Sequence, residues 1–334
     1  MTIRRAAILA LAVVVLLTGC RERRESPRAA DRLTIVRLNV GPSMTYAPVV
    51  IAKEEGYFKD EGIDAQFESL DSPSALVATA AGKLDVLSMG IGAGVFNLIL
   101  KGARMRVVAD KTHSTGGDCD HAAFIASVAT ADRIAAHGGS LRGEKLATAR
   151  GGLMEYLFDR LLERSGTAPG ETIAIQLPRG AAPSTREKTD AIRFVNEPDL
   201  TYSLSAGWAK VVAPADAVAP GHQSAVLVYG RRMLDDPDLG RRFMRAYLRG
   251  VRQYLLGKTP RNVEIISRYT KVPPDVVRRA CWPAIAADGR VEQAAIQPFL
   301  DWALEKKYLD APAPMSAWWD PAFIEAAARQ PGPR

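Results

Sequence analysis

The stretch of sequence that decides the fold is residues 33–70, LTIVRLNVGPSMTYAPVVIAKEEGYFKDEGIDAQFESL. Apolar residues alternate over residues 33–40 and stop at a Gly-Pro pair, which predicts a strand followed by a turn. Residues 46–55 then have the spacing of a helix, which Gly56 ends. Alternation resumes at residues 65–70 and predicts a second strand. The order strand, helix, strand indicates an α/β protein.

The same alternation continues along the chain. Ser72 and Pro73 have the residue types of an N-cap and a first helical position, and Gly82 ends that helix. Further strands are expected at residues 84–89, 106–109, 145–149, 172–177, 191–195, 211–213 and 225–229, and further helices at residues 95–100, 153–164 and 241–256. Repeated βα units predict a parallel sheet with helices on both faces. The last two strands are expected to return the chain between two lobes.

The helix expected at residues 241–256 is amphipathic. Its apolar face carries Phe243, Tyr247, Val251, Tyr254 and Leu255, and arginines lie largely away from that face at positions 241, 242, 245, 249 and 252. A basic stripe can bind nucleic acid, but arginines opposite an apolar face are typical of a solvated helix surface. We therefore predict a solvated face and no nucleic-acid partner.

The N-terminus has the features of an export signal. Arg4 and Arg5 precede an unbroken apolar run at residues 6–17, and the segment ends in Leu-Thr-Gly-Cys20. Small residues before a cleavage point are typical of a secretory signal, and about a dozen apolar residues are too few to span a membrane. Leu-Thr-Gly-Cys resembles a bacterial lipobox, which implies that Cys20 is lipidated and becomes the new N-terminus. The charged residues 21–32 are expected to form a flexible tether.

Composition places limits on the rest. After the signal and the tether, about 300 residues remain, enough for two lobes. The net charge of +7, with 24% charged residues, points to no particular partner. Besides Cys20 the chain has only Cys119 and Cys281. An oxidising compartment would permit them to pair, but two isolated thiols are the interpretation that we favour.

Common catalytic and metal motifs are absent from the sequence. It contains no Cys-x-x-Cys, His-Glu-x-x-His, Gly-x-Ser-x-Gly or P-loop pattern. His113, Asp118, Cys119, Asp120 and His121 lie close together in sequence, but a polar surface loop is favoured over a metal site. Gly90, Gly92 and Gly94 have the wrong spacing for a dinucleotide site, and we interpret them as a loop that lets backbone N–H groups approach a ligand. We expect no enzymatic activity, no metal and no cofactor.

Several segments resemble the SsuA/THI5-like (NMT1/THI5) family of solute-binding proteins, which serves nitrate, taurine, alkanesulfonate and thiamine-precursor importers. The likeness is strongest over residues 46–110, with Ala47-Pro48, AKEEGYFKDEGI at 52–63 and AAGKLDV at 80–86. LRGEK at 141–145 and Asn196-Glu197-Pro198 resemble elements of the family's second lobe. Residues 180–188 are short and polar where the family commonly has a helix ending in Gly-x-x-Asp-Ala.

The resemblance implies a two-lobed periplasmic-binding-protein (type II) fold of hinged, doubly wound sheets with a helical C-terminal region. The expected parts are a signal peptide (1–20), a tether (21–32), the first part of lobe 1 (33–113), lobe 2 (114–221), and a return to lobe 1 with the C-terminal helices (222–330). Expected partners are a small-molecule ligand, an ABC permease with its ATPase, and the membrane through lipidated Cys20. The protein is expected to be an extracytoplasmic monomer.

Ligands of open α/β sheets lie beyond the carboxyl ends of the strands, and this rule selects loops in both lobes. The selected residues are Ser43, Met44, Tyr46, Ser72, Ser74, Met89, Gly90, Gly92, His113, Ser114, Arg150, Gly151, Gly152, Asn196, Glu197 and Tyr202.

Each selected residue type has a chemical role and an ordinary alternative. Ser72 and Gly152 begin helices, where an anion is favoured, although Ser72 could simply cap its helix. Arg150 could pair with a carboxylate, sulfonate or phosphate, or lie free on the surface. Tyr46 could stack on the ligand or pack in the core. Glu197 would suit a ligand amine or a salt bridge between lobes. An anionic, zwitterionic or heteroaromatic ligand remains open.

Two other functions compete with transport. Thiamine-precursor synthases and some menaquinone-pathway enzymes resemble this fold, and His113 would then be the residue to suspect. The export signal argues against these cytosolic enzymes. An exported sensor domain that presents ligand to a receptor is the other alternative.

Overall fold

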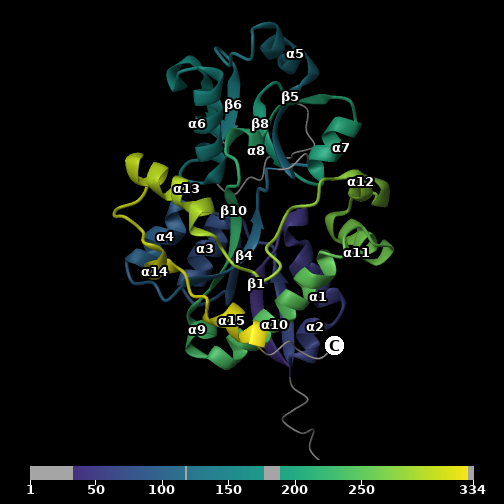
Figure 1. Ribbon diagram of the computed structural model, residues 1–334, viewed down its shortest axis with the longest axis vertical. Coiled ribbons are helices and arrows are strands. Elements are labelled where there is room, and N and C mark those ends of the chain that lie inside the picture. Colours follow the sequence, from purple (N-terminus) through teal and green to yellow (C-terminus); the bar gives the residue numbers. More distant parts are fainter. Residues whose placement is uncertain (1–32, 117–118, 177–188, 330–334) are drawn as a thin grey trace, which may run out of the picture. The chain divides into compact units, whose positions relative to one another are not determined.

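The computed structural model describes residues 33–116, 119–176 and 189–329, so the signal peptide, the tether, Asp118 and residues 180–188 lie outside the described residues. The first sheet has the strand order β2-β1-β3-β10-β4. Its strands are β1 (Thr34–Asn39), β2 (Ile63–Glu68), β3 (Val86–Gly90), β4 (Arg106–His113) and β10 (Gln223–Tyr229). β10 lies between β3 and β4 and runs antiparallel to both (Figure 1).

The second sheet has the order β7-β6-β8-β5-β9. Its strands are β5 (Ala122–Ser127), β6 (Lys145–Thr148), β7 (Ile173–Gln176), β8 (Ile192–Asn196) and β9 (Ala209–Pro214). β5 is antiparallel to both of its neighbours, whereas β6 is parallel to β7 and β8. The expected parallel pairing therefore holds for most strands of each sheet but is wrong for β5 and β10. β5 and β10 each follow a crossing from the carboxyl edge of the other sheet. The helix in the second crossing, Ala215–Val218, is too short to carry the chain back along the sheet, so both strands enter at the carboxyl edge and run backwards.

Helices cover both sheets. They are α1 (Ala47–Glu54), α2 (Tyr57–Asp60), α3 (Ser72–Ala80), α4 (Ala93–Leu100), α5 (Val128–Ala136), α6 (Leu153–Ser165), α7 (Asp199–Ser205), α8 (Ala215–Val218), α9 (Arg231–Asp235), α10 (Pro237–Tyr254), α11 (Pro260–Thr270), α12 (Pro274–Arg279), α13 (Gln293–Glu305), α14 (Met315–Trp318) and α15 (Ala322–Arg329), with 3-10 turns η2 (Met44–Tyr46) and η3 (Pro169–Glu171). The N-cap of α3 is Asp71 rather than Ser72, since the Asp71 carboxylate accepts the Ser74 N–H.

The long helix α10 packs on α1, α2 and α15. Four of its expected apolar residues are buried, but Leu255 follows the helix end and is 46% exposed. Arg252 is exposed as expected, but other arginines of the helix are paired with acidic side chains. Arg245 makes a bidentate ion pair with Glu61, and Arg249 pairs with Asp60 at 2.8 Å. These pairs fix α10 against the C-terminal end of α2.

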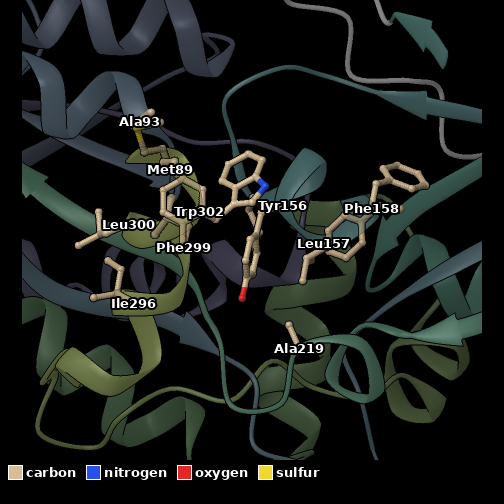
Figure 2. Packing of buried hydrophobic residues seen from close by; sticks show 14 of the residues in the cluster. Met89, Ala93, Tyr156, Leu157, Phe158, Ala219, Ile296, Phe299, Leu300 and Trp302 are labelled. Carbon is tan, nitrogen blue, oxygen red and sulfur yellow. The ribbon is translucent and has the colours of Figure 1, made fainter. Parts of the chain in front are cut away.

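One hydrophobic cluster joins the two lobes through α13. Phe299 on α13 lies 6.4 Å from Phe96 of α4 and 5.9 Å from Tyr156 of α6, measured between ring centroids. Trp302 also packs edge-on against Tyr156 (Figure 2). A second cluster lies between the first sheet and helices α1, α10, α11 and α15. The two clusters cover opposite faces of that sheet.

Candidate functional site

The carboxyl edges of the two sheets meet through exchanged backbone hydrogen bonds. The Met44 N–H donates to the Glu197 carbonyl at 3.1 Å, and the Ser43 hydroxyl reaches the same oxygen at 3.4 Å. Met44 itself is fully buried, so it contributes backbone to this contact while its side chain packs in the core. Ser43, Met44 and Glu197, selected from both lobes by sequence, are therefore brought together.

Glu197 is held as a structural link. Its side-chain oxygens accept the Thr201 N–H at 2.9 Å, the Thr201 hydroxyl at 2.7 Å and the Cys281 N–H at 3.2 Å. The residue is 2% exposed, and burial raises the pKa of its carboxyl group despite these donors. Of the two alternatives for Glu197, a ligand amine or a salt bridge between lobes, the structure shows no salt bridge among the described residues; the carboxylate accepts the backbone N–H of Cys281 instead.

The glycine loops of the two lobes pair with one another. Gly92 and Gly152 are the N-caps of α4 and α6 and form an isolated antiparallel bridge. The Ala93 N–H donates to the Gly151 carbonyl at 2.9 Å, and the Leu153 N–H donates to the Ile91 carbonyl at 3.1 Å. The first N–H of each helix, which could have bound an anion, is thus used between the lobes.

A buried lysine that the sequence pattern missed lies at the carboxyl end of β4. Lys111 is 5% exposed, and its ammonium sits 3.4 Å from the centroid of the Tyr46 ring. Burial lowers the pKa of Lys111 well below its ordinary value. The expected strand stopped at residue 109 and so placed Lys111 in a loop. The sequence did contain a signal for this residue. The charged pair Asp110-Lys111 directly follows a run of apolar strand residues.

Tyr46 connects Lys111 of β4 to β3, the strand on the other side of β10. The Tyr46 hydroxyl donates to the Ser88 carbonyl at 3.2 Å, and burial raises the pKa of Tyr46 to about 12. The Ser88 hydroxyl is fully buried and has no hydrogen-bond partner in the described part of the chain. Such unpaired buried polar groups are rare in native proteins and call for an explanation.

A small cavity of about 40 Å³ lies where the chain crosses between the sheets. Its lining includes His113, Ser114, Asp120, His121 and Asp216. This volume holds only one or two waters and excludes an organic solute. The His113 Nδ1 is hydrogen-bonded to the Asp110 carboxylate at 2.9 Å, and this bond raises the pKa of His113. His121 is 3% exposed, so the expected polar surface loop is wrong for that residue.

Cys119 and Cys281 form a disulfide with 5.4 Å between their Cα atoms. The interpretation of two isolated thiols is therefore wrong. Their separation of 162 residues hides the pairing in the sequence, because nothing local indicates that α12 ends beside the crossing segment. The disulfide ties the crossing segment before β5 to the chain that follows α12.

Other selected residues are placed apart from these contacts. Ser72, Ser74 and Arg150 are exposed, and the Asp71 carboxylate occupies the N-terminus of α3. Gly90 is exposed and Met89 is buried in the cluster of Figure 2. Asn196 and Tyr202 are half-buried. The described residues contain no group of three or more His, Cys, Asp or Glu side chains that could hold a metal ion.

A larger cavity of about 1040 Å³ lies elsewhere. It is lined by Arg106, which begins β4, and by residues of α9, α10 and α15. His113 ends the same strand, so this cavity is at the amino edge of the first sheet. Ligands of open α/β sheets bind at the other edge. We therefore place the candidate site at the carboxyl edge, around Lys111 and the loops that join the lobes.

The buried His121 should make stability dependent on pH. Burial, with His222 and His113 adding to it, lowers the pKa of His121 to about 4, whereas an unfolded histidine has a pKa of about 6.5. Between these values the unfolded chain binds more protons, so stability falls as pH falls. Urea unfolding at pH 7 and at pH 5 measures this loss in the free energy of unfolding. The loss should be about 2 kcal/mol smaller in His121→Gln than in wild type. The exposed His137→Gln should behave as wild type; equal losses in all three proteins would contradict the prediction.

A family model described as NMT1/THI5 like matches residues 43–258, more than half of the chain. The chain belongs to the NMT1/THI5-like family. The resemblance seen in the sequence is thereby confirmed. No curated protein matches the chain.

Solved structures share the fold of this NMT1/THI5-like chain. The ligand-binding component of an ABC-type import system from Staphylococcus aureus, solved with zinc bound, is 16% identical with a TM-score of 0.70, covering 89% of this chain and 99% of that one. The alkanesulfonate-binding protein SsuA from Xanthomonas axonopodis pv. citri, bound to MOPS, is 16% identical with a TM-score of 0.66, covering 86% and 98%. The desulfurization enzyme DSZB is 13% identical with a TM-score of 0.61, covering 89% and 99%.

These likenesses confirm the two-lobed α/β fold expected for the NMT1/THI5-like chain. They do not extend by themselves to a ligand, because both a binding protein and an enzyme share the fold. Within the described residues, no helix combines the length and apolar character needed to cross a membrane.

Proposed function

We propose that the chain is an extracytoplasmic solute-binding lipoprotein that captures a small molecule between its two lobes for an ABC importer. The observation that carries the proposal is the meeting of the two carboxyl edges, where loops of both sheets exchange backbone hydrogen bonds beside a buried lysine for which the described residues supply no counter-ion. The chain passes from one sheet to the other after β4 and back again after β9, and two such passages can serve as a hinge about which lobes separate and close.

The compartment is supported by two independent features. Residues 1–20 have the sequence features of an export signal that ends in a lipobox-like Cys20. The Cys119–Cys281 disulfide forms and persists in oxidising compartments such as the periplasm or a cell surface. A monomer that works with a permease and its ATPase, with no nucleic-acid partner, completes the proposal.

The proposed function is tested with the purified domain that begins after Cys20. A thermal-shift screen against sulfonates, nitrate, pyrimidines, flavins and aromatic acids should find a compound that raises the Tm. Mass spectrometry of the recovered compound should find it unchanged. Turnover of the bound compound would instead support an enzyme, the second candidate, which the likeness to DSZB favours. In that case His113, hydrogen-bonded to the buried Asp110, is the first residue to replace.

Lipid anchoring is tested separately at Cys20. Wild-type protein expressed in a bacterial host should fractionate with membranes, because a diacylated cysteine with an amide-linked chain supplies the several acyl groups that stable anchoring requires. Cys20→Ser should move most of the protein to the soluble extracytoplasmic fraction or leave the signal uncleaved. A Cys20→Ser protein that is correctly cleaved and still membrane-bound would exclude lipidation of Cys20 as the anchor.

A further inference from the structure

The cavity of about 1040 Å³ at the amino edge of the first sheet, here called the amino-edge cavity, is strongly basic. Five of the twelve residues that line it are arginine and two are aspartate, so its lining carries a net charge of +3. The arginines come from the start of β4 and from α10 and α15, which pack side by side (Figure 1). They are Arg104, Arg106, Arg241, Arg245 and Arg329. A concave surface with one sign of charge attracts ligands of the opposite sign.

Two of these arginines have no acidic partner among the described residues. Arg106 is half-buried, and its guanidinium donates to the Met105 carbonyl at 2.7 Å. Arg329 is exposed at the end of α15, and it makes no hydrogen bond and no ion pair within the described part of the chain. Arg245, by contrast, is held by Glu61. Arg106 and Arg329 therefore keep guanidinium N–H groups for a ligand.

The two aspartates of the cavity are engaged by other groups. The Asp320 carboxylate accepts the Ala322 N–H at 3.0 Å at the start of α15. Asp238 pairs with Arg242, a residue outside the lining, at 2.9 Å. Neither aspartate balances the two unpaired arginines. Because a guanidinium presents paired N–H groups that match phosphate oxygens, the cavity suits a phosphate group in particular.

The tether expected at residues 21–32 reaches the domain at the same edge. β1 is parallel to β3, and both β3 and β4 are antiparallel to β10, so β1 and β4 run in the same direction. Thr34 begins β1 and Arg106 begins β4, so both lie at the amino edge. Twelve residues span at most about 40 Å when fully extended. A membrane that holds Cys20 therefore lies within reach of the amino-edge cavity.

We propose that the amino-edge cavity binds the head group of an anionic phospholipid in the membrane that holds Cys20, with Arg106 and Arg329 as ligands of its phosphate. The inference rests on the lipid anchor of the proposed function and adds a second membrane contact to it. Docking at this edge turns the carboxyl edge away from the bilayer, where solute arrives. The contact must then be released before the joined lobes can reach a permease, which agrees with the modest attraction that each arginine adds at a lipid surface.

Vesicle binding tests the head-group site without the anchor. The compact unit of the structure begins at Leu33, so a domain that starts there keeps the cavity and lacks both Cys20 and the arginines of the tether. We expect it to sediment with vesicles of three parts phosphatidylcholine to one part phosphatidylglycerol, and not with phosphatidylcholine alone. The double variant Arg106→Gln/Arg329→Gln should bind the anionic vesicles about tenfold more weakly or worse.

A second double variant controls for the change in net charge. Arg252→Gln/Arg278→Gln removes two exposed arginines that do not line the cavity, and it should bind the anionic vesicles as wild type does. If Arg106→Gln/Arg329→Gln is poorly folded by circular dichroism, the exposed Arg329→Gln alone replaces it. We expect that single variant to bind several-fold more weakly than wild type.

Hydrogen exchange of the lipidated full chain tests the place of the contact. In vesicles that contain phosphatidylglycerol, the amides of α15 should exchange more slowly than in vesicles of phosphatidylcholine alone. The amides of α7, in the second lobe, should exchange equally in both. Equal exchange of α15 in the two kinds of vesicle would overturn the proposal.

The outcomes also distinguish the head-group site from the anchor. Equal vesicle binding by wild type and Arg106→Gln/Arg329→Gln, or equal binding to both kinds of vesicle, rejects the site and leaves the anchor standing. A wild-type domain that is stabilised by inorganic phosphate but binds no vesicle would assign the cavity to a soluble anion and overturn the membrane contact. The anchor is decided by the Cys20→Ser fractionation, whose result does not enter the vesicle test because that domain lacks Cys20.

Discussion

Replacing Cys119 and Cys281 together by serine should lower the free energy of unfolding by about 4 kcal/mol and the Tm by about 6 °C. The disulfide closes a loop across 162 positions, and the unfolded chain gains the entropy of that loop when the bond is absent. The folded state should change little, because the hydrogen bond from the Cys281 N–H to the Glu197 carboxylate keeps residue 281 in place without the disulfide. Urea unfolding and calorimetry of the purified variant measure both quantities.

Reduction supplies the matched control for this prediction. Wild type in a strong thiol reductant should unfold at the midpoint of the double serine variant, whereas the variant itself should not respond to the reductant. A wild-type protein whose midpoint is the same oxidised and reduced would contradict the prediction and would place the stability of this region in its packing alone.

Gly250→Ala should destabilise the fold by about 2–3 kcal/mol, although alanine is the better helix former by about 1 kcal/mol. A Cβ at position 250 would lie 2.2 Å from the Pro48 carbonyl oxygen and 2.9 Å from the Ala52 Cβ. The first is a backbone atom of α1 and the second is a Cβ, whose position the backbone fixes. Neither atom can therefore rotate away. α10 and α1 would have to separate, which loosens the buried layer that carries Tyr46. Equilibrium denaturation measures the loss.

Gly94→Ala is the matched control for that substitution. Gly94 lies in α4, and its nearest neighbour is the end of the flexible Leu76 side chain at 3.1 Å. That methyl group can move, so the gain in helix propensity should leave stability unchanged or raised by up to about 1 kcal/mol. Equal midpoints for the two alanine variants would contradict the argument from the α1–α10 contact.

Local patterns predicted many of the secondary-structure elements, but the pairing of strands had no local signal. Alternation located β1 and β10 to within a few residues, and Gly166 ended α6 in a left-handed conformation. The position of β10 between β3 and β4 depends on contacts more than 100 residues apart in sequence. The α1–α10 contact that excludes a side chain at Gly250 is equally non-local.

The sequence predicted which loops lie at the candidate site, but it did not predict how their polar groups are bonded or that Lys111 lies there. The rule on carboxyl ends located the loops of Ser43, Gly92, Gly152 and Glu197, which meet as neighbours. It could not tell that their polar groups bond to one another across the lobes. Lys111 was missed because a lysine inside a buried strand is rare, and periodicity treats it as the end of the strand.

The central place of β10 also affects the order in which the molecule can assemble. The strands of the second sheet come from one uninterrupted segment, residues 122–214, whereas the first sheet needs a strand from residues 223–229 at its middle. As the chain emerges, β3 and β4 have no partner between them until the whole second lobe has followed. The second lobe can therefore fold first, while the early strands of the first keep open, aggregation-prone edges for longer.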